Sequence, residues 1–184
     1  MRIIGGFLKR REISVPAGNV VRPTTDRTRE ALFNVIEHRI DLDDSDVLDL
    51  FAGSGSLGFE AVSRGARSVI LVEKDRQAVR TIRDNARKLD IEDTCSIVQA
   101  DAGHWLDRFG GPGFDLILTD PPYDYPDLAT LPARAIRHLH AGGLFVLEHD
   151  LRVSFETSRH LVLSRAYGRT MVSVFGSGEH IPNP

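Results

Sequence analysis

A glycine-rich turn between an apolar stretch and a helical pattern constrains the fold of this chain most. Residues 49–58 read DLFAGSGSLG and directly follow the apolar pair Val47 and Leu48. Glycine tolerates backbone dihedrals that a Cβ forbids, and it lets the main chain approach a ligand closely. A strand that ends in such a turn and leads into a helix is typical of βαβ units, which bind ligands at the carboxyl edge of a parallel sheet.

The rest of the chain supports this interpretation, because segments of β-forming residues alternate with helical patterns from about residue 46 onward. The expected strands cover residues 47–51, 68–72, 95–99, 114–119 and 144–149, and the expected helices cover residues 57–64, 76–89, 104–109 and 127–139. Gly142-Gly143 should form the turn before the fifth strand. Residues 161–167 and 171–175 flank Gly168-Arg169 and predict an antiparallel hairpin. The predicted fold class is therefore α/β, with a Rossmann-like, mostly parallel seven-stranded sheet and a C-terminal antiparallel hairpin.

The N-terminal region has a different pattern. Residues 3–4 and 12–15 predict short strands or a hairpin, and Thr25 offers an N-cap for a helix over residues 26–40. We expect residues 1–40 to form a small basic extension and residues 41–184 to form the main domain. Residues 1–30 hold seven basic and three acidic side chains, although the whole chain has a net charge of −3. Such local cation density suits a phosphate backbone, and a solvated surface explains it equally well.

Composition narrows the class of protein further. The apolar stretches are far shorter than the roughly 20 residues that a membrane span requires, and the N-terminus lacks the order of a secretory signal, so we expect a cytoplasmic protein. Cys95 is the single cysteine and is expected to be a buried small hydrophobe. The seven histidines show no metal-ligand spacing, so no metal site is expected. A monomer is the default expectation.

The glycine turn also contains a known phosphate-binding pattern. Gly53, Gly55 and Gly58 satisfy G-x-G-x-x-G, and Glu73 lies 20 residues after Gly53 at the end of the next strand. The carboxylate of Glu73 could accept both hydroxyl protons of an adenosine ribose. Taken alone, this pattern fits an NAD-dependent oxidoreductase as well as other adenosine-binding enzymes.

Two further carboxylates favour S-adenosylmethionine over a dinucleotide. Asp49 lies beside the turn, where its charge suits the cationic amino group of a methionine moiety and would repel a pyrophosphate. Asp101 follows the third strand and is placed to accept a hydrogen bond from an adenine amino group, although a simple turn or helix cap is the alternative.

The tetrapeptide Asp120-Pro121-Pro122-Tyr123 directly follows the expected strand at 114–119, so it should share a crevice with the glycine turn. Two prolines make a rigid turn that presents carbonyl oxygens. Hydrogen bonds from a purine amine to the Asp120 carboxylate and the Pro121 carbonyl would free the nitrogen lone pair for attack on a methyl group. Tyr123 can stack on a flipped base. The alternative is a rigid structural loop.

Other polar residues carry weaker signals. The run Glu148-His149-Asp150 could approach the crevice, but a surface turn is the favoured interpretation. Trp105 is expected to pack against the sheet, and Ser54 and Ser56 lack a partner base in the sequence, so a nucleophilic serine has little support.

With these motifs in place, the chain resembles the RsmD family of 16S rRNA guanine-N2 methyltransferases within the class I S-adenosylmethionine-dependent enzymes. The resemblance is carried by residues 49–55, Glu73, Asp101 and Asp120-Pro121-Pro122-Tyr123, and more narrowly by RPTTDRTREALFN at residues 22–34. It implies the class I methyltransferase fold, S-adenosylmethionine as cofactor, and the exocyclic N2 amine of a guanine in small-subunit ribosomal RNA as methyl acceptor. The assembled or assembling small subunit would be the partner.

The resemblance also implies roles for individual residues. The cofactor would contact Asp49, Phe51, Ala52, Gly53, Ser54, Gly55, Glu73, Lys74, Asp101, Ala102 and Asp120. The target guanine would be held by Asp120, Pro121, Pro122 and Tyr123. The residues that would bind RNA are Arg2, Lys9, Arg10, Arg11, Arg22 and Arg27. An adenine-N6 DNA methyltransferase and a non-catalytic RNA-binding protein with this fold are the alternatives.

Overall fold

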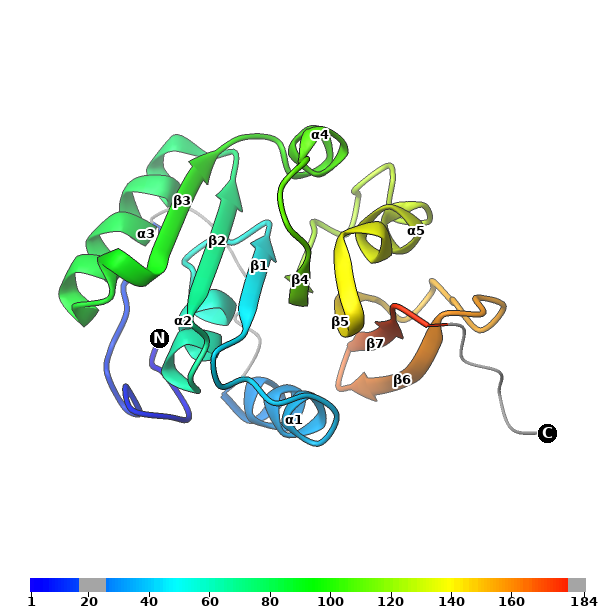
Figure 1. Ribbon diagram of the computed structural model, residues 1–184, viewed down its shortest axis with the longest axis horizontal. Coiled ribbons are helices and arrows are strands. Elements are labelled where there is room, and N and C mark those ends of the chain that lie inside the picture. The colour runs from blue at the N-terminus through cyan, green and yellow to red at the C-terminus, as the bar shows by residue number, and fades with distance from the viewer. Residues whose placement is uncertain (17–25, 179–184) are drawn as a thin grey trace.

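The computed structural model describes residues 1–16 and 26–178, and its centre is one seven-stranded sheet (Figure 1). The strands are β1 (Asp46–Leu50), β2 (Ser68–Glu73), β3 (Cys95–Gln99), β4 (Phe114–Thr119), β5 (Leu139–Asp150), β6 (Leu161–Tyr167) and β7 (Thr170–Gly176). Their order is β3-β2-β1-β4-β5-β7-β6, and β1 to β5 are parallel. Because β7 is antiparallel to both β5 and β6, the predicted closing hairpin is confirmed.

Helices cover both faces of the sheet. They are α1 (Asp26–Glu37), α2 (Ser56–Ser63), α3 (Arg76–Leu89), α4 (Ala102–Arg108) and α5 (Leu131–Ala135), with single 3-10 turns at Glu92–Thr94 and Ile136–His138. Alternate residues of each strand point to opposite faces, so Leu116 and Leu118 share a cluster with α1, α2 and α3, whereas Ile117 packs with α4 and α5. This is a three-layer arrangement of helices, sheet and helices.

Two of the expected elements around β5 were wrong. The helix predicted over residues 127–139 is only α5 and the following 3-10 turn, because a helix from Asp127 would place Pro132 in its interior, against the carbonyl of Leu128. The predicted turn at Gly142-Gly143 lies inside β5, which begins at Leu139. The β4–β5 register shifts near these residues, and Gly142 has a φ of 83°, so the glycines form a bulge and the strand continues.

Smaller differences concern the ends of helices and the N-terminal strands. The helix predicted over residues 26–40 ends at Glu37, and the short one predicted over residues 104–109 begins earlier, at Ala102. The N-terminal strands reduce to one antiparallel bridge between Arg2 and Glu12. The expected N-cap, Thr25, lies outside the described residues.

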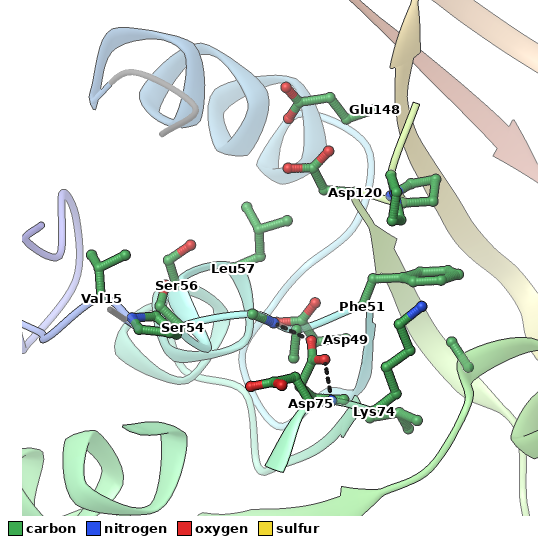
Figure 2. A pocket seen from close by; sticks show the side chains of 18 of the residues that line it. Val15, Asp49, Phe51, Ser54, Ser56, Leu57, Lys74, Asp75, Asp120 and Glu148 are labelled. Atoms are coloured by element: carbon green, nitrogen blue, oxygen red, sulfur yellow. Dashed lines mark hydrogen bonds between the residues drawn. The ribbon is translucent and has the colours of Figure 1, made fainter. Parts of the chain in front are cut away.

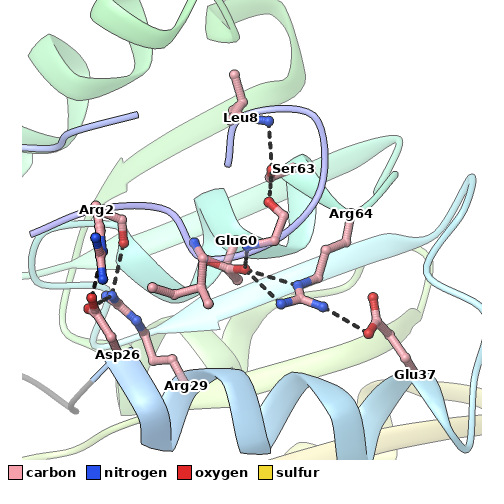
Figure 3. A network of polar contacts seen from close by, with 10 residues as sticks. Arg2, Leu8, Asp26, Arg29, Glu37, Glu60, Ser63 and Arg64 are labelled. Atoms are coloured by element: carbon pink, nitrogen blue, oxygen red, sulfur yellow. Dashed lines mark hydrogen bonds and ion pairs between the residues drawn. The ribbon is translucent and has the colours of Figure 1, made fainter. Parts of the chain in front are cut away.

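The N-terminal arm, residues 1–16, is held to the body by a buried carboxylate (Figure 3). Glu60 of α2 is fully buried and accepts hydrogen bonds from the backbone nitrogens of Ile4 at 2.8 Å and Gly5 at 2.7 Å. Its Oε1 also pairs with Arg64 Nη2 at 2.9 Å, and Arg64 reaches Glu37 of α1 at 2.8 Å. One acidic side chain therefore connects the arm, α2 and, through Arg64, α1.

Apolar packing joins the same parts. Ile3, Leu8 and Ile13 of the arm and Phe33 of α1 belong to one buried cluster with Val47 of β1. The division into residues 1–40 and 41–184 stays a sequence-based prediction, and the described part of the extension shares the core of the sheet. No helix within the described ranges is long and apolar enough to cross a bilayer.

Glu60→Ala should lower the free energy of unfolding by about 3–5 kcal/mol, because it leaves two backbone N–H groups and the mostly buried Arg64 without their carboxylate. Urea unfolding followed by circular dichroism measures the change. The matched control is Asp84→Ala, which removes an exposed ion pair with Arg87 and should change stability by under about 1 kcal/mol. Equal effects of the two substitutions would contradict the anchoring role of Glu60.

Candidate active site

A cavity of about 570 Å³ opens at the carboxyl ends of β1, β2 and β4, where the strand order reverses between β1 and β4 (Figure 2). Open α/β sheets bind ligands at this position, and the volume suits a nucleotide-sized molecule. Twelve predicted residues line it: Asp49, Phe51, Ala52, Gly53, Ser54, Glu73, Lys74, Ala102, Asp120, Pro121, Pro122 and Tyr123. The fold thus brings the glycine turn and the Asp-Pro-Pro-Tyr tetrapeptide to one cavity.

The backbone conformation of the turn after β1 restricts which residues can form it. Gly55 has a φ of 81°, and a Cβ there would lie 2.5 Å from the Phe59 ring, so no other residue fits. Phe51 also has a positive φ, 60°, which is unusual for a bulky residue and is found at functional sites. Its ring and that of Tyr125 pack in a T-shaped arrangement, with the ring centroids 5.0 Å apart.

Asp49 is the buried acid at the base of the cavity. Its side chain is 1% exposed, and its Oδ2 accepts a hydrogen bond from the backbone nitrogen of Gly58 at 2.8 Å. The pKa of this carboxyl is raised to about 7, because burial and, to a smaller extent, the charge of Glu73 outweigh the Gly58 hydrogen bond, which lowers it. A cation bound beside Asp49 would favour the charged form, so the site is suited to a positively charged group.

Glu73, at the end of β2, shapes the rim next to Asp49. Its Oε2 accepts a hydrogen bond from the Gly53 nitrogen at 2.9 Å, and its Oε1 accepts one from the Asp75 nitrogen at 2.8 Å. Each carboxylate oxygen has a second lone pair, so both can also accept from the hydroxyls of a ligand. Glu73 therefore holds the glycine turn and remains chemically able to bind a ribose.

The tetrapeptide after β4 lines the other end of the cavity. Pro121 is buried, and Tyr123 is 46% exposed, with its hydroxyl 3.3 Å from the Thr170 hydroxyl of β7. Asp120 is partly buried; desolvation, followed by the charges of Glu148 and Asp49, raises its pKa well above the usual range. An exposed aromatic ring can stack on a planar base, and the ionised form of the neighbouring Asp120 carboxyl can accept hydrogen bonds from an amine of that base.

Two predicted cofactor residues do not line the cavity. Gly55 is the N-cap of α2 and is part of the turn, but it does not line the cavity. Asp101 is the N-cap of α4, where its Oδ1 accepts a hydrogen bond from the His104 nitrogen at 3.0 Å. The helix cap that was the alternative for Asp101 is therefore present, and its contact with an adenine stays a prediction.

Sequence reasoning missed several lining residues. Glu148 was assigned to a surface turn, which was wrong, because it is 7% exposed in β5 and lines the cavity. Its place at the carboxyl end of a parallel strand was the signal that could have found it. The other missed residues are Met1, Val15, Pro16, Ser56, Leu57, Val72 and Asp75.

Three of the missed residues belong to the N-terminal arm, and a buried amide explains their position. Asn85 of α3 accepts from the Ser14 nitrogen at 2.8 Å, and it donates to the backbone oxygens of Ser14 at 2.9 Å and Ser54 at 3.1 Å. The arm is thereby tied to the glycine turn and forms part of the cavity wall. No local sequence pattern predicts a contact between two residues that are 71 positions apart in the chain.

The predicted RNA-binding residues are spread over the arm and α1. Lys9, Arg10 and Arg11 are exposed in the arm, and Arg11 Nη2 donates to the Lys88 carbonyl at 2.6 Å. Arg27 is exposed on α1, and Arg2 pairs with Asp26 at 2.7 Å. Arg22 lies outside the described residues.

Within residues 1–16 and 26–178, no three His, Cys, Asp or Glu side chains are arranged to hold a metal ion. Cys95 is partly buried, and burial raises the pKa of its thiol to about 12. Trp105 packs against the core on one face of the sheet, as the sequence predicted, and it also stacks on Phe109.

The seven-stranded sheet with its antiparallel hairpin and an acidic, glycine-rich site at the switch point define the class I methyltransferases, and the chain has that fold. Within the class it belongs to the family described as conserved hypothetical protein 95, whose family model matches residues 1–176. The resemblance to the RsmD family is thereby confirmed.

Relatives cover the chain to different extents. A Bacillus subtilis protein named "Putative rRNA methyltransferase YlbH" is 37% identical over 182 residues, which is 95% of this chain and 98% of that protein. "Ribosomal RNA small subunit methyltransferase D" of Escherichia coli is 40% identical over 123 residues, or 67% of this chain and 60% of that protein. A solved Escherichia coli structure, "Putative methyltransferase yhhF", is 30% identical, with a TM-score of 0.83 over 96% of this chain and 97% of that one.

Asp49→Asn should raise the melting temperature of the ligand-free protein by roughly 5 °C at pH 8, because it removes a buried charge. The folded pKa of about 7 exceeds that of an exposed aspartate, so the wild type loses stability as pH rises toward 7. The advantage of Asp49→Asn should therefore grow from about pH 4 to pH 7 and then level off. Calorimetry with exposed Asp93→Asn as control measures it, and a difference independent of pH would contradict the raised pKa.

Proposed function

We propose that the chain transfers a methyl group from S-adenosylmethionine to the exocyclic N2 amine of a guanine in small-subunit ribosomal RNA. The observation that carries this proposal is that buried Asp49 and the Asp120–Tyr123 tetrapeptide line one cavity. One end of that cavity suits a cationic amino acid moiety, and the other suits a flat base with an amine. A methyl donor and a methyl acceptor can therefore meet inside it.

The cavity residues fit the cofactor. Asp49 would hold the amino group of the methionine moiety, Glu73 would accept from the ribose hydroxyls, and the backbone around Gly53 would lie against the ligand. Asp101 is the proposed acceptor for the adenine amino group. When bound, S-adenosylmethionine supplies an electrophilic methyl group on a positively charged sulfur.

The tetrapeptide would activate the acceptor. A guanine amine is a weak nucleophile because its lone pair is delocalised into the ring. Hydrogen bonds from its two N–H groups to the Asp120 carboxylate and the Pro121 carbonyl would localise that lone pair, while Tyr123 stacks on the base. These contacts orient the nitrogen toward the methionine end of the cavity.

Asp120 would also take the surplus proton. Methylation leaves the amine nitrogen with one proton too many, and a carboxylate in hydrogen-bond contact can accept it. The raised pKa of Asp120, caused by burial and then by Glu148 and Asp49, makes it a better base than an exposed aspartate. The proton can then pass to solvent when the product leaves.

Ribosomal RNA is the proposed partner because the relatives named above carry rRNA methyltransferase names, and one names the small subunit. The exposed cations Lys9, Arg10 and Arg11 lie in the same arm as Met1, Val15 and Pro16, which line the cavity. Because Arg11 contacts the Lys88 carbonyl at the C-terminal end of α3, which is remote from the cavity, RNA phosphates bound there would position the substrate on the body at a distance from the reacting base. We extend the proposal to a monomer that acts in the cytoplasm on the small subunit or its assembly intermediate.

The experiment that tests this function is transfer of labelled methyl from S-adenosylmethionine to small ribosomal subunits that lack their natural modifications. Nucleoside analysis of the extracted RNA should reveal N2-methylguanosine. Methyl-adenine on DNA with no product on subunits would replace the proposal with an adenine-N6 DNA enzyme. Tight subunit binding without any transfer would indicate a non-catalytic RNA-binding protein.

Asp120→Asn should lower kcat by at least roughly 100-fold, since it removes both the charge that polarises the amine and the proton acceptor. Binding of S-adenosylhomocysteine, measured by calorimetry, should stay within a few-fold. In the wild type, kcat/KM should fall as pH drops through the raised pKa of Asp120, because only the ionised carboxylate accepts from the amine. Loss of S-adenosylhomocysteine binding instead would mean that the tetrapeptide supports the fold.

Charge reversal at Arg10 and Arg11 should raise KM for subunits roughly tenfold at low salt, and the effect should shrink as salt rises. Both side chains are exposed in the arm, so kcat should change little. Reversal at Arg108, an exposed arginine of α4, is the control. An unchanged KM at every salt concentration would remove the arm from the RNA interface.

A further inference from the structure

We propose that Glu148 determines the choice of base, by accepting a hydrogen bond from the N1–H group of guanine next to the reacting amine. This inference rests on the proposed function and assigns a specificity role that the Asp-Pro-Pro-Tyr chemistry leaves open, since that motif suits guanine-N2 and adenine-N6 equally.

The register of the sheet places Glu148 beside Asp120. Strands β4 and β5 are parallel, and Thr119 pairs with Leu147, so the next residues along the two strands are Asp120 and Glu148. Neighbouring strands lie about 4.8 Å apart, and paired positions point to the same face of a sheet. Figure 2 shows the carboxylates of Asp120 and Glu148 next to each other at one end of the cavity.

This arrangement is costly for the ligand-free protein. Glu148 is 7% exposed, and its charge is the second cause, after burial, that raises the pKa of Asp120. Two like charges in a poorly hydrated site destabilise each other, and such pairs are concentrated at functional sites. A ligand that offers two adjacent hydrogen-bond donors would relieve the repulsion by binding one carboxylate with each donor.

Guanine offers that pattern and adenine does not. The N1–H and N2–H₂ groups of guanine are neighbouring donors on one edge, whereas the N1 of adenine next to its N6 amine is an acceptor. With Asp120 on the amine, Glu148 would accept from the guanine N1–H. With adenine, Glu148 would face the lone pair on N1, and the repulsion between these two acceptors disfavours the wrong base.

The test compares two enzymes on two substrates. Small subunits are reconstituted from transcribed 16S rRNA that carries either guanine or adenine at the position where the wild type produces N2-methylguanosine. The variant is Glu148→Gln, which keeps the shape and can donate an N–H to adenine N1. We expect its kcat/KM on the guanine subunit to fall by roughly 10–100-fold, and N6-methyladenosine to appear on the adenine subunit.

Three readouts separate this role from a structural one. S-adenosylhomocysteine binding should change little, and the melting temperature should not fall, because the substitution removes a charge that repels Asp120. The acid limb of the kcat/KM profile should move to lower pH, because Glu148→Gln removes a charge that faces Asp120 and leaves Asp49 as the remaining one. The matched control is Glu156→Gln, an exposed residue outside the cavity, which should leave the base preference and the profile unchanged.

The outcomes are distinguishable. An unchanged ratio of guanine to adenine product with Glu148→Gln, whether through full activity or equal loss on both substrates, overturns the inference. A wild type that makes no N2-methylguanosine on any guanine subunit overturns the proposed function itself. A lower ratio of guanine to adenine product with Glu148→Gln, together with intact S-adenosylhomocysteine binding, supports both the inference and the proposed function.

Discussion

The hydrogen bond between Asp49 and the Gly58 nitrogen joins the end of β1 to the first turns of α2, and the site is built around it. It closes the segment from Asp49 to Gly58, so it holds the two ends of the glycine turn together. The same bond partly compensates the burial of the carboxylate. A single contact therefore shapes the loop and keeps an acid at the base of the cavity.

Acids gather along this edge of the sheet because each parallel strand ends there. Asp49, Glu73, Asp120 and Glu148 lie within two residues of the carboxyl ends of β1, β2, β4 and β5, and all four line the cavity. Burial and mutual repulsion raise the pKa of Asp49 and Asp120, so the charged forms of these acids make the ligand-free protein less stable. A cationic cofactor and a base rich in N–H donors would relieve that strain, which links the energetics of the fold to the chemistry.

The N-terminal arm is part of the site through two buried polar side chains. Glu60 binds the backbone at Ile4 and Gly5, and Asn85 binds Ser14 and Ser54. Because buried carboxylates and amides need satisfied hydrogen bonds, these contacts hold the arm in one position. The exposed cations of the arm thus have a defined relation to the cavity.

Local patterns in the sequence determined much of this protein. Apolar residues at helical spacing specified α3, and runs of β-forming residues specified β3, β4 and β6, all at their observed bounds. The glycine turn and the tetrapeptide, each adjacent to a strand end, identified most of the cavity lining. Patterns failed where a residue depends on a distant partner. The bulge at Gly142 extended β5 beyond its predicted start, and only the pairing of β4 with β5 brought Glu148 beside Asp120. Strand register and the burial of charge arise from contacts between segments far apart in the chain, so the tertiary structure alone decided them.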